Sequence, residues 1–211
     1  EGSYGYLIQL ADGNRIDLTL NALEKLPEMQ RDSLSVLLLD KDGLVTPFPP
    51  PDERDYLPAP PSAKAFEDCC NEFWWVSTYV AKGLWRREIT YAKAMLEIVR
   101  TQLMQMLTWE IGARTDFSIN PGKEGKYFER YLAPEHWQQL LATYADADID
   151  HTWEALDAMG NLFRGVSLVV ADHFGFVYPH QDDARVCAYL SEVRFMAPNS
   201  SIPPKMPKEK P

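Results

Sequence analysis

The stretch that most constrains the fold of this chain is 46–61, which carries seven prolines, three of them consecutive at positions 49 to 51. Proline fixes φ and has no N–H to donate, so such a stretch can neither continue a helix nor pair inside a sheet. We expect an extended connector at 47–61. The residues on its two sides must then fold as separate parts.

The part before the connector has the pattern of a small sheet. Alternating segments at 4–10 and 15–20 flank the Asp12-Gly13 pair, which is a strong hairpin turn signal. A short helix is expected at about 20–30, and the apolar run 36–39 predicts a buried strand.

Helical patterns dominate after the connector. Ser62 and Asp150 are typical N-cap residues, and Asp150 is expected to cap the last helix. The expected helices are 62–83, 86–111, 127–132, 134–144 and 150–174. The tail 197–211 is rich in Pro and Lys and has no apolar period, so we expect it to be disordered. The fold class is therefore α+β, a small sheet followed by a helical bundle.

Composition excludes several classes of protein. The formal net charge of -10 repels nucleic acid, and no apolar stretch is long enough to cross a membrane. The three cysteines make no disulfide framework, and no His lies at a metal-ligand spacing from them. We expect reduced, packed thiols in a cytoplasmic protein.

Asp17 is the first candidate for chemistry. It lies in the middle of an expected strand, on the face opposite Ile16, Leu18 and Leu20. A carboxylate at such a place can serve a functional site. The alternative is a solvated outer face, shared with Thr19 and with Arg15 as a charged neighbour.

A second candidate is one face of the helix that begins at Ser62. Residues at steps of three and four make this face acidic, then aromatic, then basic: Asp68, Glu72, Trp75, Tyr79, Lys82 and Arg86. Its acidic end could hold ammonium groups, its rings could pack against a sugar, and Lys82 could neutralise phosphate. The alternative is an ordinary solvated helix face. The opposite stripe, expected to be buried, is Phe66, Phe73, Val80 and Leu84.

A third candidate is the turn 122–128, where Lys123 and Lys126 precede a helix and could approach phosphate. The turn lacks the glycine spacing of a Walker loop. A plain turn between two helices is the alternative.

Several segments together resemble the aminoglycoside 6-adenylyltransferases, which act on streptomycin and belong to the polymerase-β-like nucleotidyltransferases. The segments are Asp12-Gly-Asn-Arg-Ile-Asp-Leu-Thr-Leu20, Leu37-Leu-Leu-Asp-Lys-Asp-Gly43, Phe66-Glu-Asp-Cys-Cys-Asn-Glu-Phe-Trp74 and Lys126-Tyr-Phe-Glu-Arg-Tyr-Leu132. The most specific is Asp-Cys-Cys-Asn-Glu-Phe-Trp. By this resemblance, 1–46 is a remnant of a nucleotidyltransferase domain with a partial mixed sheet, and 62–196 is a helical substrate-binding domain.

The resemblance implies a reaction. A drug hydroxyl attacks the α-phosphorus of ATP, pyrophosphate leaves, and magnesium ions held by aspartates align the reactants. Asp17 matches the third carboxylate of that constellation, as a metal ligand or as the group that takes the hydroxyl proton. Lys82 resembles the lysine that meets the triphosphate, and Lys126 is a second nucleotide candidate. Charge and placement assign drug contacts to Asp68, Glu72, Trp75 and Tyr79.

The sequence departs from the family pattern at one point. The family places a Gly-Ser turn and an Asp-x-Asp strand before the strand of Asp17, whereas here Gly2-Ser3 is followed by Tyr-Gly-Tyr. One carboxylate cannot hold two magnesium ions, so we expect an incomplete chain that is inactive by itself. Two alternatives are a non-catalytic binder of a cationic sugar or nucleotide through the face from Asp68 to Arg86, and a helical interaction protein.

Overall fold

The structure is a computed structural model that describes residues 2–29 and 31–196. The chain divides into two compact units, Glu1–Asp55 and Tyr56–Pro211. The division lies inside the proline-rich stretch 47–61. The disorder expected for 197–211 concerns residues outside the described ones.

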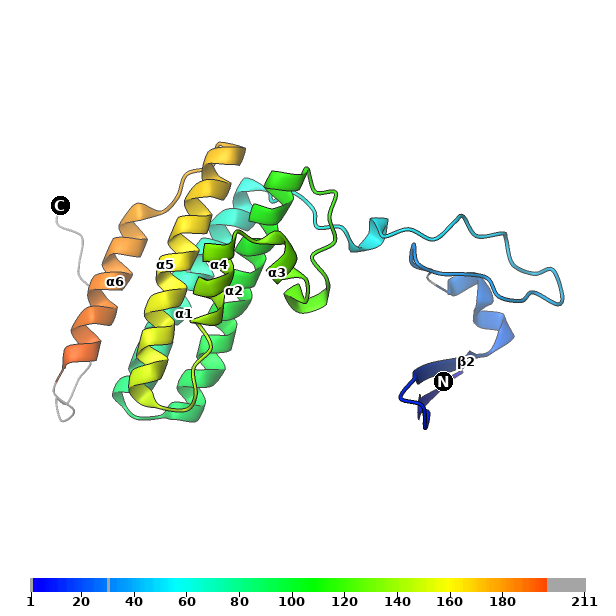
Figure 1. Cartoon of the computed structure of the whole chain (residues 1–211), viewed down its shortest axis with the longest axis horizontal. Coiled ribbons are helices and arrows are strands. Elements are labelled where there is room, and N and C mark those ends of the chain that lie inside the picture. The colour runs from blue at the N-terminus through cyan, green and yellow to red at the C-terminus, as the bar shows by residue number, and fades with distance from the viewer. Residues whose placement is uncertain (1, 30, 197–211) are drawn as a thin grey trace. The chain divides into compact units, whose positions relative to one another are not determined.

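The first unit contains a β-hairpin (Figure 1). Strand β1 (Ser3–Gln9) pairs antiparallel with β2 (Arg15–Asn21), as the Asp12-Gly13 turn predicts. In this register Tyr6 lies opposite Leu18, so the apolar residues of both strands share one face. None of the described residues up to Asp55 is buried, because no second layer covers this face among them.

Two expectations for the first unit are wrong in detail. Residues 36–39 form no strand, and Leu38 is 92% exposed, because no described strand lies beside this run to pair with it. In place of a helix over 20–30, a short 3-10 helix, η1 (Leu23–Glu28), includes Pro27. Proline lacks the N–H that a longer α-helix would need there. A second 3-10 turn, η2, covers Arg54–Tyr56.

The second unit is a helical bundle. Its helices are α1 (Ala63–Trp85), α2 (Ile89–Thr115), α3 (Phe128–Tyr131), α4 (Pro134–Leu141), α5 (Ile149–Phe174) and α6 (His180–Phe195), with a 3-10 turn η3 at Lys123–Gly125. The long helices lie side by side, α1 against α2 and α6, and α5 against α2 (Figure 1). The expected α+β class, a small sheet followed by helices, is confirmed. Among the described residues, none of the helices has the length and apolarity to cross a bilayer.

Side-chain caps mark the beginnings of helices α1 and α5. The Ser62 side chain accepts a hydrogen bond from the Ala65 N–H at 3.1 Å, so the predicted cap of α1 is confirmed. The predicted cap of α5 is wrong by two residues. Asp148, not Asp150, accepts the N–H groups of Asp150 and His151, because helix α5 begins at Ile149.

Aromatic rings from α1 and α5 form the centre of the core. Phe73 stacks on Phe163 with ring centroids 3.7 Å apart, and Trp74 meets the same ring edge-on. Cys69 and Cys70 are free and buried beside them, as expected for packed thiols. Burial raises the pKa of the Cys70 thiol to about 12.

Helix α6 is absent from the sequence-based expectation. Its buried residues Val186, Tyr189, Leu190 and Val193 follow helical spacing, and they pack on α1. Polar residues cover the rest of the helix, and its N-terminal turn buries a carboxylate, Asp183. The apolar stripe is therefore narrow, which is why the segment is easily read as a loop.

Candidate functional site

The exposed face of α1 carries the stripe that the sequence predicts, here called the α1 face. Asp68, Trp75 and Arg86 are exposed, and Glu72, Tyr79 and Lys82 are half-buried. The opposite stripe is buried at all four positions: Phe66, Phe73, Val80 and Leu84. The predicted register of this helix is confirmed.

Three residues in the middle of the α1 face contact one another. The Trp75 indole Nε1–H donates to the Tyr79 hydroxyl oxygen at 2.7 Å, and the two rings meet edge-on. The Lys82 Nζ lies 5.5 Å from the centre of the Tyr79 ring, close enough for a cation–π contact. Because the Tyr79 oxygen accepts this bond, its own O–H remains able to donate. The α1 face therefore presents a hydroxyl donor beside an ammonium group.

The acidic end of the α1 face borders a depression between α1 and the first turn of α6. Its volume is about 410 Å³, and Asp68, Asn71, Trp75 and Asp182 are among its lining residues. Asp68 already accepts hydrogen bonds from Lys64 Nζ at 2.7 and 2.9 Å. A cationic ligand would therefore compete with Lys64 for Asp68.

A second depression, of about 430 Å³, lies between α1 and α2 and is lined by Glu72 together with Asp68, Gln102 and Gln105. Glu72 forms no hydrogen bond or ion pair with any other described residue. Its carboxylate is therefore free to accept from a ligand. Two of the predicted drug contacts, Asp68 and Glu72, thus share this depression, and Asp68 and Trp75 share the other.

Asn71 and Asp182 border the α1 face but escaped the sequence analysis. Asn71 lies one residue before Glu72 and lines both depressions. Its position between Asp68 and Glu72 on the helix could have pointed to it. Asp182 comes from α6, and no local signal links it to α1.

The turn 122–128 adopts a conformation that favours glycine. Gly122 and Gly125 have φ of 77° and 68°, and Glu124 also has a positive φ. The Lys126 Nζ lies 4.7 Å from the centre of the Tyr127 ring. Helix α3, which follows, spans four residues, too short for the helix N-terminal phosphate site suggested by the sequence.

The two candidate nucleotide lysines lie in different halves of the bundle. The turn of Lys126 packs on Met104 of α2, near Gln102, whose carbonyl is 3.5 Å from the Cys69 Sγ of α1. Lys82 lies about 20 Å further along α1 than Cys69, since a helix rises about 1.5 Å per residue. The structure therefore groups Lys82 with Trp75 and Tyr79, and leaves Lys126 apart from them.

Asp17 lies on β2 opposite Leu7, with its side chain 53% exposed. Arg15 donates to both of its oxygens, from Nε and Nη2, at 2.8 Å each. This hydrogen bond and the charge of Asp17 raise the pKa of Arg15. Arg15 and Asp17 therefore form a solvent-exposed ion pair, and exposed pairs of this kind contribute little to stability.

Within residues 2–29 and 31–196, no three His, Cys, Asp or Glu side chains come together as a metal site would require. A pair of magnesium ions needs several carboxylate oxygens. Asp17 with its arginine partner does not supply them alone.

Comparison with known proteins identifies the chain's family. The sequence model described as streptomycin adenylyltransferase matches residues 1–193. The chain belongs to the streptomycin adenylyltransferase family. Curated relatives in this family are aminoglycoside 6-adenylyltransferases from Bacillus subtilis (strain 168), 39% identical over 183 residues, and from Campylobacter jejuni, 40% identical over 185 residues.

These matches cover most of this chain but less of the relatives. They include 85% and 87% of the chain, which spans 64% of the length of each relative. A solved structure titled as an aminoglycoside 6-adenyltransferase from Bacillus subtilis is 35% identical, with a TM-score of 0.62 over 92% of this chain and 72% of that one. The resemblance read from the sequence and the expected fold class are both confirmed.

This member of the streptomycin adenylyltransferase family also has a buried polar cluster between α5 and α6. Arg164 donates to both oxygens of Asp183, at 2.6 and 2.7 Å, and the Tyr178 hydroxyl donates to the same carboxylate at 2.9 Å. Burial by itself raises the pKa of Asp183, but hydrogen bonds from Arg164, Cys187 and Tyr178 outweigh it and hold the pKa below its usual value. Asp183 is therefore an ionised group inside the bundle.

Proposed function

We propose that the chain acts in aminoglycoside O-adenylyl transfer: AMP passes from ATP to a hydroxyl of streptomycin, and pyrophosphate leaves. The drug would lose its activity as the adenylyl ester, which is a mechanism of antibiotic resistance in the cytoplasm. The observation that carries the proposal is the family match over residues 1–193, together with relatives that are named aminoglycoside 6-adenylyltransferases.

The α1 face supports binding of the drug. Glu72 has a carboxylate without a partner in the described structure, and Asp68 lies one helical turn before it. Ammonium and guanidinium groups of an aminoglycoside are donors that match these carboxylates. Trp75 is 52% exposed, and its ring can pack against the apolar side of a sugar.

The basic end of the α1 face supports binding of the nucleotide. The Lys82 ammonium would neutralise triphosphate charge, and the neighbouring Tyr79 O–H would donate to a phosphate or hydroxyl oxygen. Drug and nucleotide would then lie along one helix. Lys126, which the structure places elsewhere on the bundle, is a weaker candidate for the same role.

We assign to Asp17 the removal of the proton from the attacking hydroxyl, or a metal contact. The hydroxyl oxygen forms a bond to the α-phosphorus, the bond to pyrophosphate breaks, and the proton goes to a carboxylate. Magnesium would supply charge neutralisation at the phosphates when bound with ATP. Because Asp17 alone does not fit a pair of ions, we propose that a polypeptide of these 211 residues does not release pyrophosphate by itself.

Calorimetric titration with streptomycin tests the role of the α1 face. We expect binding by the unaltered chain and about tenfold weaker binding by Glu72→Gln, since a charge-assisted hydrogen bond at a half-exposed position contributes about 1 to 1.5 kcal/mol. Asp172→Asn, which removes the same charge from an exposed position on α5, is the matched control and should bind as the unaltered chain does. Equal losses of streptomycin affinity in both variants would mean that net charge, and not a contact with Glu72, causes the effect.

A second function, a non-catalytic binder of a cationic sugar or nucleotide, is favoured by the single strand carboxylate. Pyrophosphate release with ATP, magnesium and streptomycin, if it is lost in Asp17→Asn, would support adenylyl transfer and disprove the expected inactivity of the 211-residue chain. Binding of both ligands without release is expected under either function, so the residues encoded before Tyr4 separate the two: an Asp-x-Asp strand there would support adenylyl transfer, and its absence would favour the binder. Binding of neither ligand would contradict both functions.

A further inference from the structure

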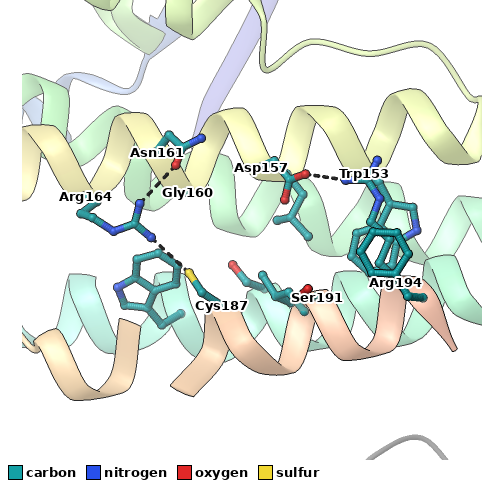
Figure 2. Close-up of a pocket in the computed structure, with 13 residues that line it drawn as sticks. Trp153, Asp157, Gly160, Asn161, Arg164, Cys187, Ser191 and Arg194 are labelled. Carbon is teal, nitrogen blue, oxygen red and sulfur yellow. Dashed lines mark hydrogen bonds and ion pairs between the residues drawn. The ribbon is translucent and has the colours of Figure 1, made fainter. Parts of the chain in front are cut away.

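A groove between α5 and α6 encloses a cavity of about 320 Å³ (Figure 2). This is the size of a small-ligand pocket. Trp153, Leu156 and Leu190 form its apolar part, and Asn161, Ser191 and Arg194 are polar groups that line it. None of the residues assigned to the drug, the nucleotide or the metal lines this groove, so it is a separate feature.

Among the polar groups of the groove, hydrogen-bond donors without a partner outnumber acceptors without a partner. Arg194 Nη1 donates to Asp157 Oδ2 at 2.5 Å, which leaves four guanidinium N–H groups without a partner in the described structure. Asn161 uses only its Oδ1, which accepts from Arg164 at 3.2 Å, so its NH₂ is free. The Ser191 hydroxyl makes no hydrogen bond with any other described residue. A ligand that fits must therefore supply acceptor oxygens.

The groove is held in shape before any ligand arrives. The guanidinium of Arg164 is fixed by both oxygens of Asp183. It also donates to the Cys187 Sγ at 3.1 Å, as Figure 2 shows. The guanidinium of Arg194 lies 5.8 Å from the centre of the Trp153 ring. Binding would thus require little ordering of these side chains, which favours affinity.

Gly160 keeps the groove open. A Cβ at this position would meet no atom nearer than the Trp74 ring at 3.8 Å, an ordinary contact, so packing does not demand glycine. Glycine in a helix interior lowers stability relative to alanine. The space in front of Gly160 is therefore retained at a cost in stability.

Phe195 adds an apolar surface at the end of α6. Its side chain is 81% exposed although it lines the groove. A flat ring bound along the groove would cover part of it. Removal of this apolar surface from water would favour binding.

We propose that the α5–α6 groove is a binding site for a small, flat aromatic acid. The ring lies against Trp153, Leu156 and Phe195, and the carboxylate accepts from Arg194 and from Ser191 or Asn161. The Arg194–Asp157 pair is neutral overall, and the arginine N–H groups left free by Asp157 meet the acid.

Calorimetry with 2-naphthoate as the probe, and with 2-naphthylmethylamine as a cation of similar shape, tests the site. We expect the unaltered chain to bind the acid at least tenfold more tightly than the amine. Gly160→Leu should abolish binding because its side chain fills the cavity. Gly165→Leu is the matched control on the same helix: a Cβ there meets nothing within 4 Å, it is exposed, and it should leave binding unchanged.

Arg194 provides the second arm of the test. Arg194→Gln should weaken binding of 2-naphthoate at least tenfold, whereas Arg194→Lys should keep most of it. Circular dichroism of each variant verifies that the helices are retained. The proposal is overturned if the acid and the amine bind equally, if the acid does not bind, or if Gly160→Leu binds as well as Gly165→Leu.

Discussion

The buried carboxylate Asp183 gives the sharpest prediction for stability. Its side chain is 8% exposed and accepts two hydrogen bonds from Arg164 and one from Tyr178. Asp183→Asn keeps the shape and removes the charge. Breaking a buried pair from one side costs about 3 to 5 kcal/mol. Because the Arg164 side chain is 34% exposed and water can solvate it again, we expect about 2 kcal/mol.

Urea unfolding followed by far-UV circular dichroism measures this loss in the free energy of unfolding. Thermal unfolding should show a fall in Tm of about 4 to 8 °C for a unit of this size. The control is Asp157→Asn, which removes the same charge from the Arg194 pair. Asp157 is 53% exposed, so its loss should stay below about 1 kcal/mol.

The lowered pKa of Asp183 also predicts how the difference in free energy of unfolding between the unaltered chain and Asp183→Asn depends on pH. A carboxyl whose pKa is lower when folded stabilises the protein above its unfolded pKa of about 3.9, and this contribution is lost as pH falls through the folded value. The gap between the unaltered chain and Asp183→Asn should therefore be constant near neutral pH and close only in acid. Equal destabilisation by Asp183→Asn and Asp157→Asn would refute the assignment of a buried, ionised pair.

Further predictions concern the helical unit. Gly125→Ala should destabilise it by about 1 kcal/mol or more, because φ is 68° at this position and a Cβ would lie 2.7 Å from Met104 Cε. Gly165→Ala should stabilise it by about 0.5 to 1 kcal/mol, because a Cβ there meets nothing within 4 Å; urea unfolding midpoints measure both effects. Ser62→Ala should cost about 1 kcal/mol, seen in the same assay, because the cap of α1 is lost. In a Cys187→Ser variant, which lacks the half-buried thiol, titration with Ellman's reagent at pH 8 should find no reactive thiol in the folded chain, since Cys69 and Cys70 are buried and the pKa of Cys70 is about 12. Both thiols should react in denaturant, and rapid reaction of the folded variant would contradict the burial.

The sequence predicts the helices well where a broad apolar stripe marks the buried side. The stripe from Phe66 to Leu84 fixed which side of α1 faces solvent, and so placed Trp75 and Tyr79 together. Helix α6 was missed because its stripe is narrow and its first turn buries Asp183. The prediction of a buried strand at 36–39 was wrong because apolar content alone cannot show whether a neighbouring strand is present to pair with it.

The same limits apply to the candidate site. Spacing along one helix predicted the contacts of Trp75, Tyr79 and Lys82, since residues three and four apart meet on a helix. It could not predict that Asp182 borders the same depression as Asp68, because that depends on how α6 packs on α1. The separation of Lys82 from Lys126 likewise depends on packing and is invisible in the sequence.

The connection between α4 and α5 is secured by two long basic side chains of α2. Arg100 donates to the Thr143 carbonyl oxygen at 2.9 Å and Lys93 to the Ala145 carbonyl oxygen at 2.7 Å. The two anchors differ in what they ask of the connection. Arg100 also donates to the Thr143 hydroxyl, so position 143 needs a hydroxyl side chain to keep both bonds. Lys93 meets only a main-chain carbonyl, which every amino acid offers, so position 145 can accept other side chains without losing its tie to α2.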